Sequence, residues 1–208
     1  MPLDNLHITA MEVTHSKTAE EINHLVEVLR PNVQSIADYP SQHLARLIKP
    51  MISYDPAALA LSFVPAAGES LCHNRTAEDD KYTYHHLRRD LHSLITKAGV
   101  DVGSRYVVPS AHLTIARFNS PNPFGEDPLD AEAGRDLKKR KHWISEIEML
   151  NKWLEAEYWP DAANQDGKEI MPGGEFIIGE EKGLDCRQGR LWYGGGETVY
   201  LGKGISRH

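Results

Sequence analysis

Two short segments, far apart in the chain, share one alternation of apolar and polar residues. The first reads Leu-His-Ile-Thr-Ala over residues 6–10, and the second reads Ala-His-Leu-Thr-Ile-Ala over residues 111–116. Successive side chains of a β-strand point to opposite faces, so each pattern predicts a half-buried strand with its aliphatic residues toward a core. Each strand would then present a histidine and a threonine side by side on its other face.

The remaining patterns predict helices and further strands along the chain. Thr18 with Glu21 predicts a capping box, and Gly99 predicts a helix C-terminal cap. Apolar spacing predicts three helices, over Glu20–Val33, Tyr84–Ala98 and about 128–159, and the last of them is highly charged. It also predicts strands over Ala57–Val64, Arg105–Val108, Glu175–Ile178, Arg190–Tyr193 and Thr198–Leu201. A glycine turn over 194–196 would join the last two strands. We therefore expect an α+β protein with antiparallel sheets, formed by one domain over residues 1–208.

Charge and hydropathy narrow the classes of partner. With 23 basic and 30 acidic residues the formal charge is -7, which disfavours long nucleic acids and leaves short or end-bound ones. The longest apolar stretch, residues 57–67, is interrupted by Ser62 and Pro65 and is shorter than the roughly 20 residues that span a bilayer. We expect no membrane partner.

The cysteines and the first residues bear on the cellular compartment. Cys72 and Cys186 are the only cysteines, too few for a disulfide framework. The sequence begins without the basic and apolar regions of a signal peptide. We expect a cytoplasmic protein, with a nuclear location also open.

The matched histidine–threonine pairs predict acid–base chemistry on a phosphoester. Cleavage of a phosphodiester without a metal needs a base for the incoming water, an acid for the departing oxygen and donors to the other phosphate oxygens. His7 and His112 can serve as base and acid near neutral pH. The hydroxyls of Thr9 and Thr114 can donate to the phosphate oxygens, where charge builds up. Which histidine is the acid and which is the base stays open.

Other histidines do not form a metal-binding pattern. His85, His86 and His92 lie on one predicted helix, but no cysteine or carboxylate stands at a familiar ligand spacing from them. We expect neither a metal nor a cofactor.

The chain resembles the 2H phosphoesterase superfamily. The resemblance rests on the two motifs at residues 7–9 and 112–114, on the helix Tyr84–Ala98 before the second motif, and on Ala-Arg-Phe at 116–118 after it. Within that superfamily the chain is similar to RNA ligase/cyclic nucleotide phosphodiesterase proteins. The likeness covers Leu3–Phe118 well and Glu175–Leu201 loosely, and it leaves the charged helix as an insertion.

The resemblance implies a fold and a reaction. The fold would be bilobal, with two antiparallel sheets flanked by helices and the four motif residues meeting in a central cleft. The reaction would be the opening of 2′,3′-cyclic phosphates, or of a related cyclic nucleotide such as ADP-ribose 1″,2″-cyclic phosphate, in RNA processing. The partner would be a small nucleotide or an RNA 3′ end.

One departure from the family concerns the start of the chain. Relatives usually carry a strand and a helix before the first motif, whereas here His7 stands almost at the beginning. The first lobe would then lack a strand, and the exposed sheet edge would favour pairing with another chain. We expect a monomer or a strand-paired dimer.

Three more residues near the second motif are candidate substrate contacts. In a regular strand Arg117 points to the face opposite His112, so it is either a structural ion pair or a substrate contact. Tyr106 and Phe118 are positioned either to stack on a base or to pack in the core.

Two other functions are compatible with the same residues. A degenerate relative would hold a nucleotide or RNA end without cleaving it. Alternatively, the histidine pair would transfer protons on a substrate that contains no phosphate.

Overall fold

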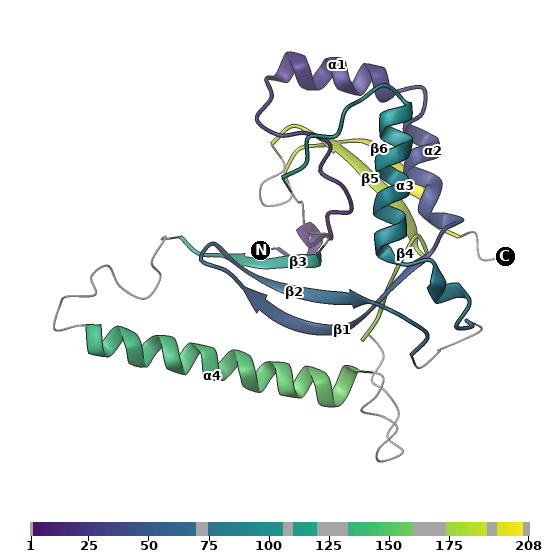
Figure 1. Ribbon diagram of the computed structural model, residues 1–208. Helices are drawn as coiled ribbons and strands as arrows, with labels where there is room; N and C mark the ends of the chain where they lie inside the picture. Colours follow the sequence, from purple (N-terminus) through teal and green to yellow (C-terminus); the bar gives the residue numbers. More distant parts are fainter. Residues whose placement is uncertain are drawn as a thin grey trace.

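The computed structural model describes residues 2–69, 75–105, 110–119, 133–159, 174–190 and 195–205. In chain order the elements are α1 (Ala19–Leu29), α2 (Val33–Asp38), β1 (Ala45–Tyr54), β2 (Ala58–Pro65), α3 (Tyr84–Lys97), β3 (Ala111–Arg117), α4 (Ala133–Tyr158), β4 (Phe176–Ile178), β5 (Lys182–Gln188) and β6 (Glu197–Lys203), with 3-10 turns at Leu3–Asn5, Tyr39–Ser41 and Asp79–Lys81. The expected α+β class is confirmed: β3, β2, β1 and β4 form a curled antiparallel sheet, and β5 pairs with β6 (Figure 1).

The first helix begins as predicted and ends earlier. The backbone N–H of Glu21 donates to the Thr18 hydroxyl at 3.2 Å, and the N–H of Thr18 donates to the Glu21 carboxylate at 2.8 Å, which completes the capping box. The predicted extension to residue 33 is wrong, because α1 ends at Leu29 and α2 starts separately at Val33. Pro31 lies in the break, where it has no N–H to continue the helix.

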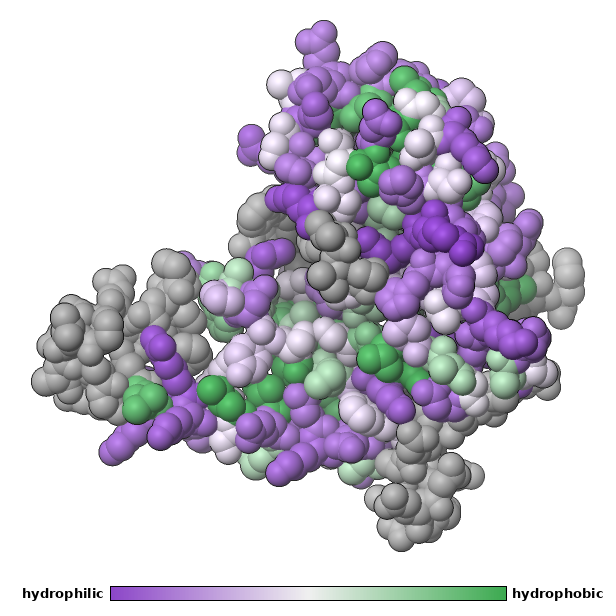
Figure 2. All heavy atoms as spheres, in the orientation of Figure 1, coloured by the Kyte–Doolittle hydropathy of each residue, from purple (hydrophilic) through white to green (hydrophobic). Residues whose placement is uncertain are grey.

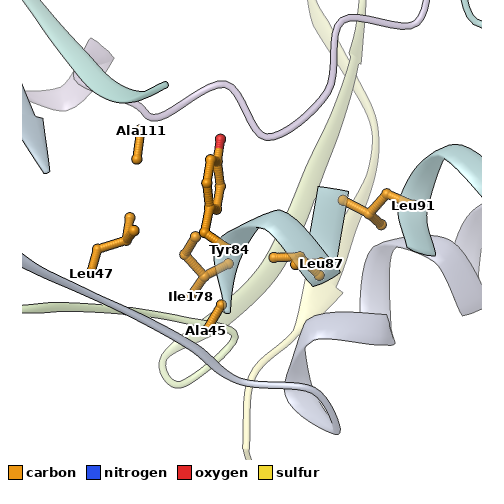
Figure 3. Close-up of a cluster of buried hydrophobic side chains, with 7 residues drawn as sticks. All are labelled: Ala45, Leu47, Tyr84, Leu87, Leu91, Ala111 and Ile178. Carbon is orange, nitrogen blue, oxygen red and sulfur yellow. The ribbon is translucent and has the colours of Figure 1, made fainter. Parts of the chain in front are cut away.

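One face of the four-stranded sheet packs against α3 to form the core. Tyr84, Leu87 and Leu91 of α3 are fully buried, and with sheet residues they form one cluster (Figure 3). The sheet residues of this cluster are Ala45, Leu47, Ala111 and Ile178. The predicted amphipathic helix is therefore confirmed together with its C-terminal cap, since Gly99 has a φ of 96°.

The charged helix α4 runs beside β1, beyond the short stretch of β1 that pairs with β4 (Figure 1). The side-chain amide of Asn151 pairs with the backbone of Ile52: its oxygen accepts from the N–H at 2.6 Å and its NH₂ donates to the carbonyl at 3.0 Å. The Trp159 indole donates to the Pro50 carbonyl at 2.9 Å. Side chains from α4 and its C-terminal end thus occupy hydrogen-bonding groups that an edge strand would expose.

The β5–β6 hairpin packs against α2, and two glycines make this contact possible. A Cβ on Gly202 would lie 2.1 Å from the carbonyl oxygen of Ala37, and one on Gly183 would lie 2.3 Å from the same atom. The sequence predicts Arg190–Tyr193 as the partner of the last strand, whereas β6 pairs with β5. Residues 191–193 of that prediction, like 106–108 of the predicted strand at Arg105–Val108, lie outside the described residues.

A buried ion cluster joins β1 to the loop before α3. The Arg46 and Asp80 side chains are 1% and 0% exposed, and the guanidinium donates to the carboxylate at 2.6 Å. Arg46 also pairs with Glu175 at 3.1 Å, and Arg75 pairs with Asp80 at 3.1 Å. Burial by itself raises the pKa of Asp80, but the hydrogen bonds and charge of Arg46 outweigh it and the pKa is lowered.

Within the described ranges, no helix is both long enough and apolar enough to span a bilayer.

We expect Gly202→Ala to destabilise the protein by about 1–3 kcal/mol, because the added methyl group forces α2 away from the hairpin. Urea unfolding measures this change. Gly103→Ala is the control, since nothing lies within 4 Å of a Cβ at that position. Equal effects of the two substitutions would contradict the tight α2–hairpin contact.

We expect Asp80→Ala to lower the free energy of unfolding by about 3 kcal/mol, because it removes the principal partner of a buried guanidinium. Thermal unfolding at neutral pH measures the loss. Glu27→Ala, which breaks the exposed Glu27–Arg30 pair, should leave the unfolding midpoint near that of the unmodified protein. A stable Asp80→Ala variant would show that the cluster adds little to stability.

Candidate active site

The first motif lies alongside β3, next to the second motif. Ile8 and Leu113 form an antiparallel β-bridge that stands outside the named strands. The prediction of a strand over residues 6–10 is therefore wrong in extent, since only Ile8 makes the bridge. The two segments nevertheless meet, although more than a hundred residues separate them in the sequence.

Two side chains of α3 hold the backbone of the first segment. The Tyr84 hydroxyl donates to the carbonyl of Thr9 at 3.1 Å, and the Arg88 guanidinium donates to the carbonyl of Ala10 at 2.6 Å. Figure 3 shows the Tyr84 hydroxyl pointing away from Ala45 and Ile178, toward the neighbouring chain trace. The segment runs beside β3 without a full ladder of strand hydrogen bonds, because these two backbone carbonyls accept hydrogen bonds from side chains of α3 instead.

The bridge register predicts one shared face for all four motif residues. Because Ile8 and Leu113 are paired, His7 lies opposite Thr114 and Thr9 lies opposite His112. Side chains alternate along a strand, and Ile8 packs with the core cluster. The alternation therefore predicts the flanking histidines and threonines on the other side of the sheet, away from that core.

His7 is exposed, and its ring is oriented by the backbone. Its Nδ1 lies 2.8 Å from the carbonyl oxygen of Asn5. A carbonyl only accepts, so Nδ1 carries the proton in this contact. In the neutral imidazole Nε2 is then the basic nitrogen.

His112 is half-buried and has polar neighbours along the sheet. Its Nδ1 lies 3.0 Å from the Ser110 hydroxyl, which can donate or accept, so either tautomer satisfies this contact. Ser62 of β2 is its paired neighbour, and the hydroxyls of Ser62 and Ser53 are 2.5 Å apart. The same face of the sheet therefore carries further hydroxyl groups beside the motifs.

The pKa of His112 lies below the ordinary value for a histidine. Burial is the largest cause, and the positive charges of Arg117 and His7 lower the pKa further. A hydrogen bond with Ser110 and the charge of Asp55 act in the opposite direction. The contribution from His7 agrees with the register in placing the two imidazoles close together.

The structure corrects the expected direction of Arg117. Ala60 pairs with Thr114 whereas Leu59 pairs with Ala116, so β3 contains one extra residue, Ile115, at this point. A bulge of this kind changes the alternation of the strand. Arg117 pairs with Ala58 and therefore shares the face of Thr114 and His112, not the opposite face.

The structure describes Phe118, one of the two aromatic residues predicted as candidate substrate contacts. The Phe118 ring packs edge-on against Trp143 of α4, with ring centroids 5.9 Å apart, so it contacts the charged helix. Tyr106 lies outside the described residues.

Sequence reasoning missed the residues that position the site. Tyr84 begins the predicted helix Tyr84–Ala98, but no sequence pattern indicates that its hydroxyl or the Arg88 guanidinium would bind the first motif segment. A second missed contact is Glu12 with Arg105, where the carboxylate accepts from the Arg105 N–H at 2.8 Å and from its guanidinium. Burial raises the pKa of Glu12, but the Arg105 bonds outweigh it and the pKa is lowered.

The described part of the chain contains no group of three or more histidines, cysteines and carboxylates placed to hold a metal ion. Comparison with models of protein families, with curated proteins and with solved structures finds no match for this chain.

We expect His112 to titrate below the ordinary histidine pKa in an NMR titration. Asp55→Asn should lower the pKa of His112 further by removing a negative charge, and Arg117→Gln should raise it by removing a positive one. Glu20→Gln, an exposed change on α1, serves as the control. An unchanged pKa in Arg117→Gln would contradict the position of Arg117 on the motif face.

Proposed function

We propose that this protein is a metal-independent phosphoesterase of the 2H type that hydrolyses a cyclic phosphodiester with His7 and His112. The supporting observation is the pairing of Ile8 with Leu113, from which the shared face of both motifs follows. Diagonal neighbours in an antiparallel pair lie about 7–8 Å apart, and His7 and His112 are such neighbours. This separation suits one phosphate and its attacking water between two imidazoles.

In the proposed reaction one imidazole accepts a proton from water as the water oxygen attacks phosphorus. The other imidazole gives a proton to the departing ring oxygen as its bond to phosphorus breaks. The products are an opened phosphomonoester and a hydroxyl, and proton exchange with solvent restores both histidines. Since each ring is held through Nδ1, Nε2 is the nitrogen that acts on the substrate.

The threonines and Arg117 have complementary roles in this proposal. The Thr9 and Thr114 hydroxyls donate to the non-bridging phosphate oxygens, where preorganised donors stabilise developing charge. Arg117 adds a positive charge on the same face, which favours an anionic substrate. The assignment of acid and base follows from how the substrate binds, because each motif offers the same pair of groups.

The proposal includes the finer features of the resemblance. In this proposal the two sheets form two lobes around a central cleft, and α4 is an insertion into a single domain. The substrate is the 2′,3′-cyclic phosphate of an RNA end or nucleotide, or a related cyclic nucleotide. Phe118 and Tyr106 remain candidate contacts to its base.

The test is hydrolysis of 2′,3′-cyclic nucleotides in the presence of a chelator. We expect turnover with a bell-shaped pH profile, and we expect His7→Ala and His112→Ala each to lower kcat by about 10²–10⁴. Thr9→Val and Thr114→Val should also lower kcat, because they remove phosphate donors and keep the side-chain shape.

His24→Ala is the matched control, since His24 is exposed on α1 and lies in neither motif. Full activity in both His7→Ala and His112→Ala would end the proposal. Calorimetric binding of the nucleotide with no product would instead support the binding-module alternative. Turnover of a substrate without phosphate would support the proton-transfer alternative.

A further inference from the structure

A row of side chains continues from the second motif across β2 to β1. His112 of β3 pairs with Ser62 of β2, and Ser62 pairs with Met51 of β1. Directly paired residues of an antiparallel ladder point to the same face of the sheet, with Cβ atoms about 4.5–5.5 Å apart. The row therefore leads from an imidazole through a hydroxyl to a thioether side chain.

A pair of hydroxyls lies at the middle of this row. The oxygens of Ser62 and Ser53 are 2.5 Å apart, so both side chains lie on the same face. Two hydroxyls carry two hydrogens and only one of them lies between the oxygens, so the pair retains one O–H for an acceptor outside it. When Ser53 is the donor within the pair, the retained O–H belongs to Ser62, beside His112.

The face that carries this row is accessible to solvent. Met51 is 39% exposed, and Val64, which alternation places on the face of Ser62, is 42% exposed. Ser62 and Ser53 are half-buried. Figure 2 shows weakly polar and apolar residues over the part of the molecule where Figure 1 draws β1 and β2. A ligand that extends from His112 across the sheet therefore meets hydroxyls first and an apolar side chain beyond them.

We propose that Ser62, Ser53 and Met51 form a nucleoside subsite, which binds the sugar and the base of the substrate beyond His112. This inference rests on the proposed function and specifies its substrate as a nucleoside cyclic phosphate. In the subsite Ser62 donates to a sugar oxygen, Ser53 orients the Ser62 hydroxyl, and Met51 contacts the base.

The order of the strands explains why the subsite meets the sugar and not the phosphate. Strand β3 has β2 on one side and the first motif segment on the other. A phosphate between the two imidazoles lies over β3 and the first motif segment, whereas Ser62 is one strand spacing farther, about 4.8 Å. A hydrogen bond reaches only about 3 Å, so Ser62 meets the group that is attached to the phosphate.

The side chains of the subsite suit a neutral nucleoside. A sugar oxygen accepts a hydrogen bond from a serine hydroxyl, and a methionine thioether makes favourable contacts with an aromatic ring such as a base. None of the three side chains carries a charge. The subsite therefore favours a sugar and a base over a second phosphate.

The experiment compares three substrates of the full chain: adenosine 2′,3′-cyclic phosphate, ribose 2′,3′-cyclic phosphate and ethylene glycol cyclic phosphate. Ser62→Ala should lower the kcat/KM for the adenosine compound, relative to the ethylene glycol compound, about tenfold through the loss of one hydrogen bond. The loss should appear mainly in KM, because the sugar is held equally before and during the reaction. Ser62→Thr keeps a hydroxyl and should restore most of this preference.

The base is tested separately from the sugar. Met51→Ala should lower the kcat/KM for the adenosine compound, relative to the ribose compound, about fivefold by removing the thioether contact.

Two matched controls remove the same side chains elsewhere. Ser41→Ala removes a half-buried hydroxyl that donates to the Asp38 carbonyl outside the four-stranded sheet, and Met149→Ala removes a methionine that is 54% exposed on α4. Both controls should leave the substrate preferences unchanged. Circular dichroism of each variant verifies that it remains folded.

The outcomes separate the subsite from the proposed function. If the unmodified protein hydrolyses none of the three compounds, the proposed function fails and the subsite fails with it. Hydrolysis with an unaltered preference in Ser62→Ala overturns the subsite and leaves the proposed function intact. Equal losses on all three compounds in Ser62→Ala also overturn the subsite, because Ser62 would then act at the phosphate.

Discussion

The position of Tyr84 is the constraint on which the candidate site depends. Its ring is fully buried between β1, β3 and β4, while its hydroxyl reaches the carbonyl of Thr9. A buried phenol needs a partner for its O–H, and a backbone carbonyl outside a strand ladder needs a donor. One contact satisfies both needs, and it fixes the first motif to the core that also supports the second motif.

Much of the fold follows from local patterns that the sequence shows directly. The Thr18–Glu21 capping box, the apolar side of α3 and the spans of β2 and β3 are each set by neighbouring residues, so periodicity alone predicts them. The similarity of the two histidine motifs predicts that they lie side by side in the fold. The bridge between Ile8 and Leu113 agrees with this prediction. Their catalytic role remains a proposal.

The parts that sequence reasoning missed depend on contacts between distant residues or on irregular backbone. Strand β1 has a register shift between Ile48 and Met51, and Lys49 within it has a φ of 55°, so its alternation is broken. Strand β5 contains Gly183 and Asp185, which are uncommon in strands, and it is held by α2 and β6. The hydrogen bond of Arg88 to Ala10 depends on tertiary geometry that no local pattern records.

The extra residue in β3 has a consequence for how such sites are recognised. His112 and Thr114 are separated by two positions, but the next residue on that face is Arg117, three positions further on. The position of the arginine cation beside the motif therefore depends on the number of residues between Thr114 and Arg117 as well as on the residue type. A relative with a straight strand would need its arginine one position earlier, and an alignment without a gap would assign the two equivalent cations to different columns.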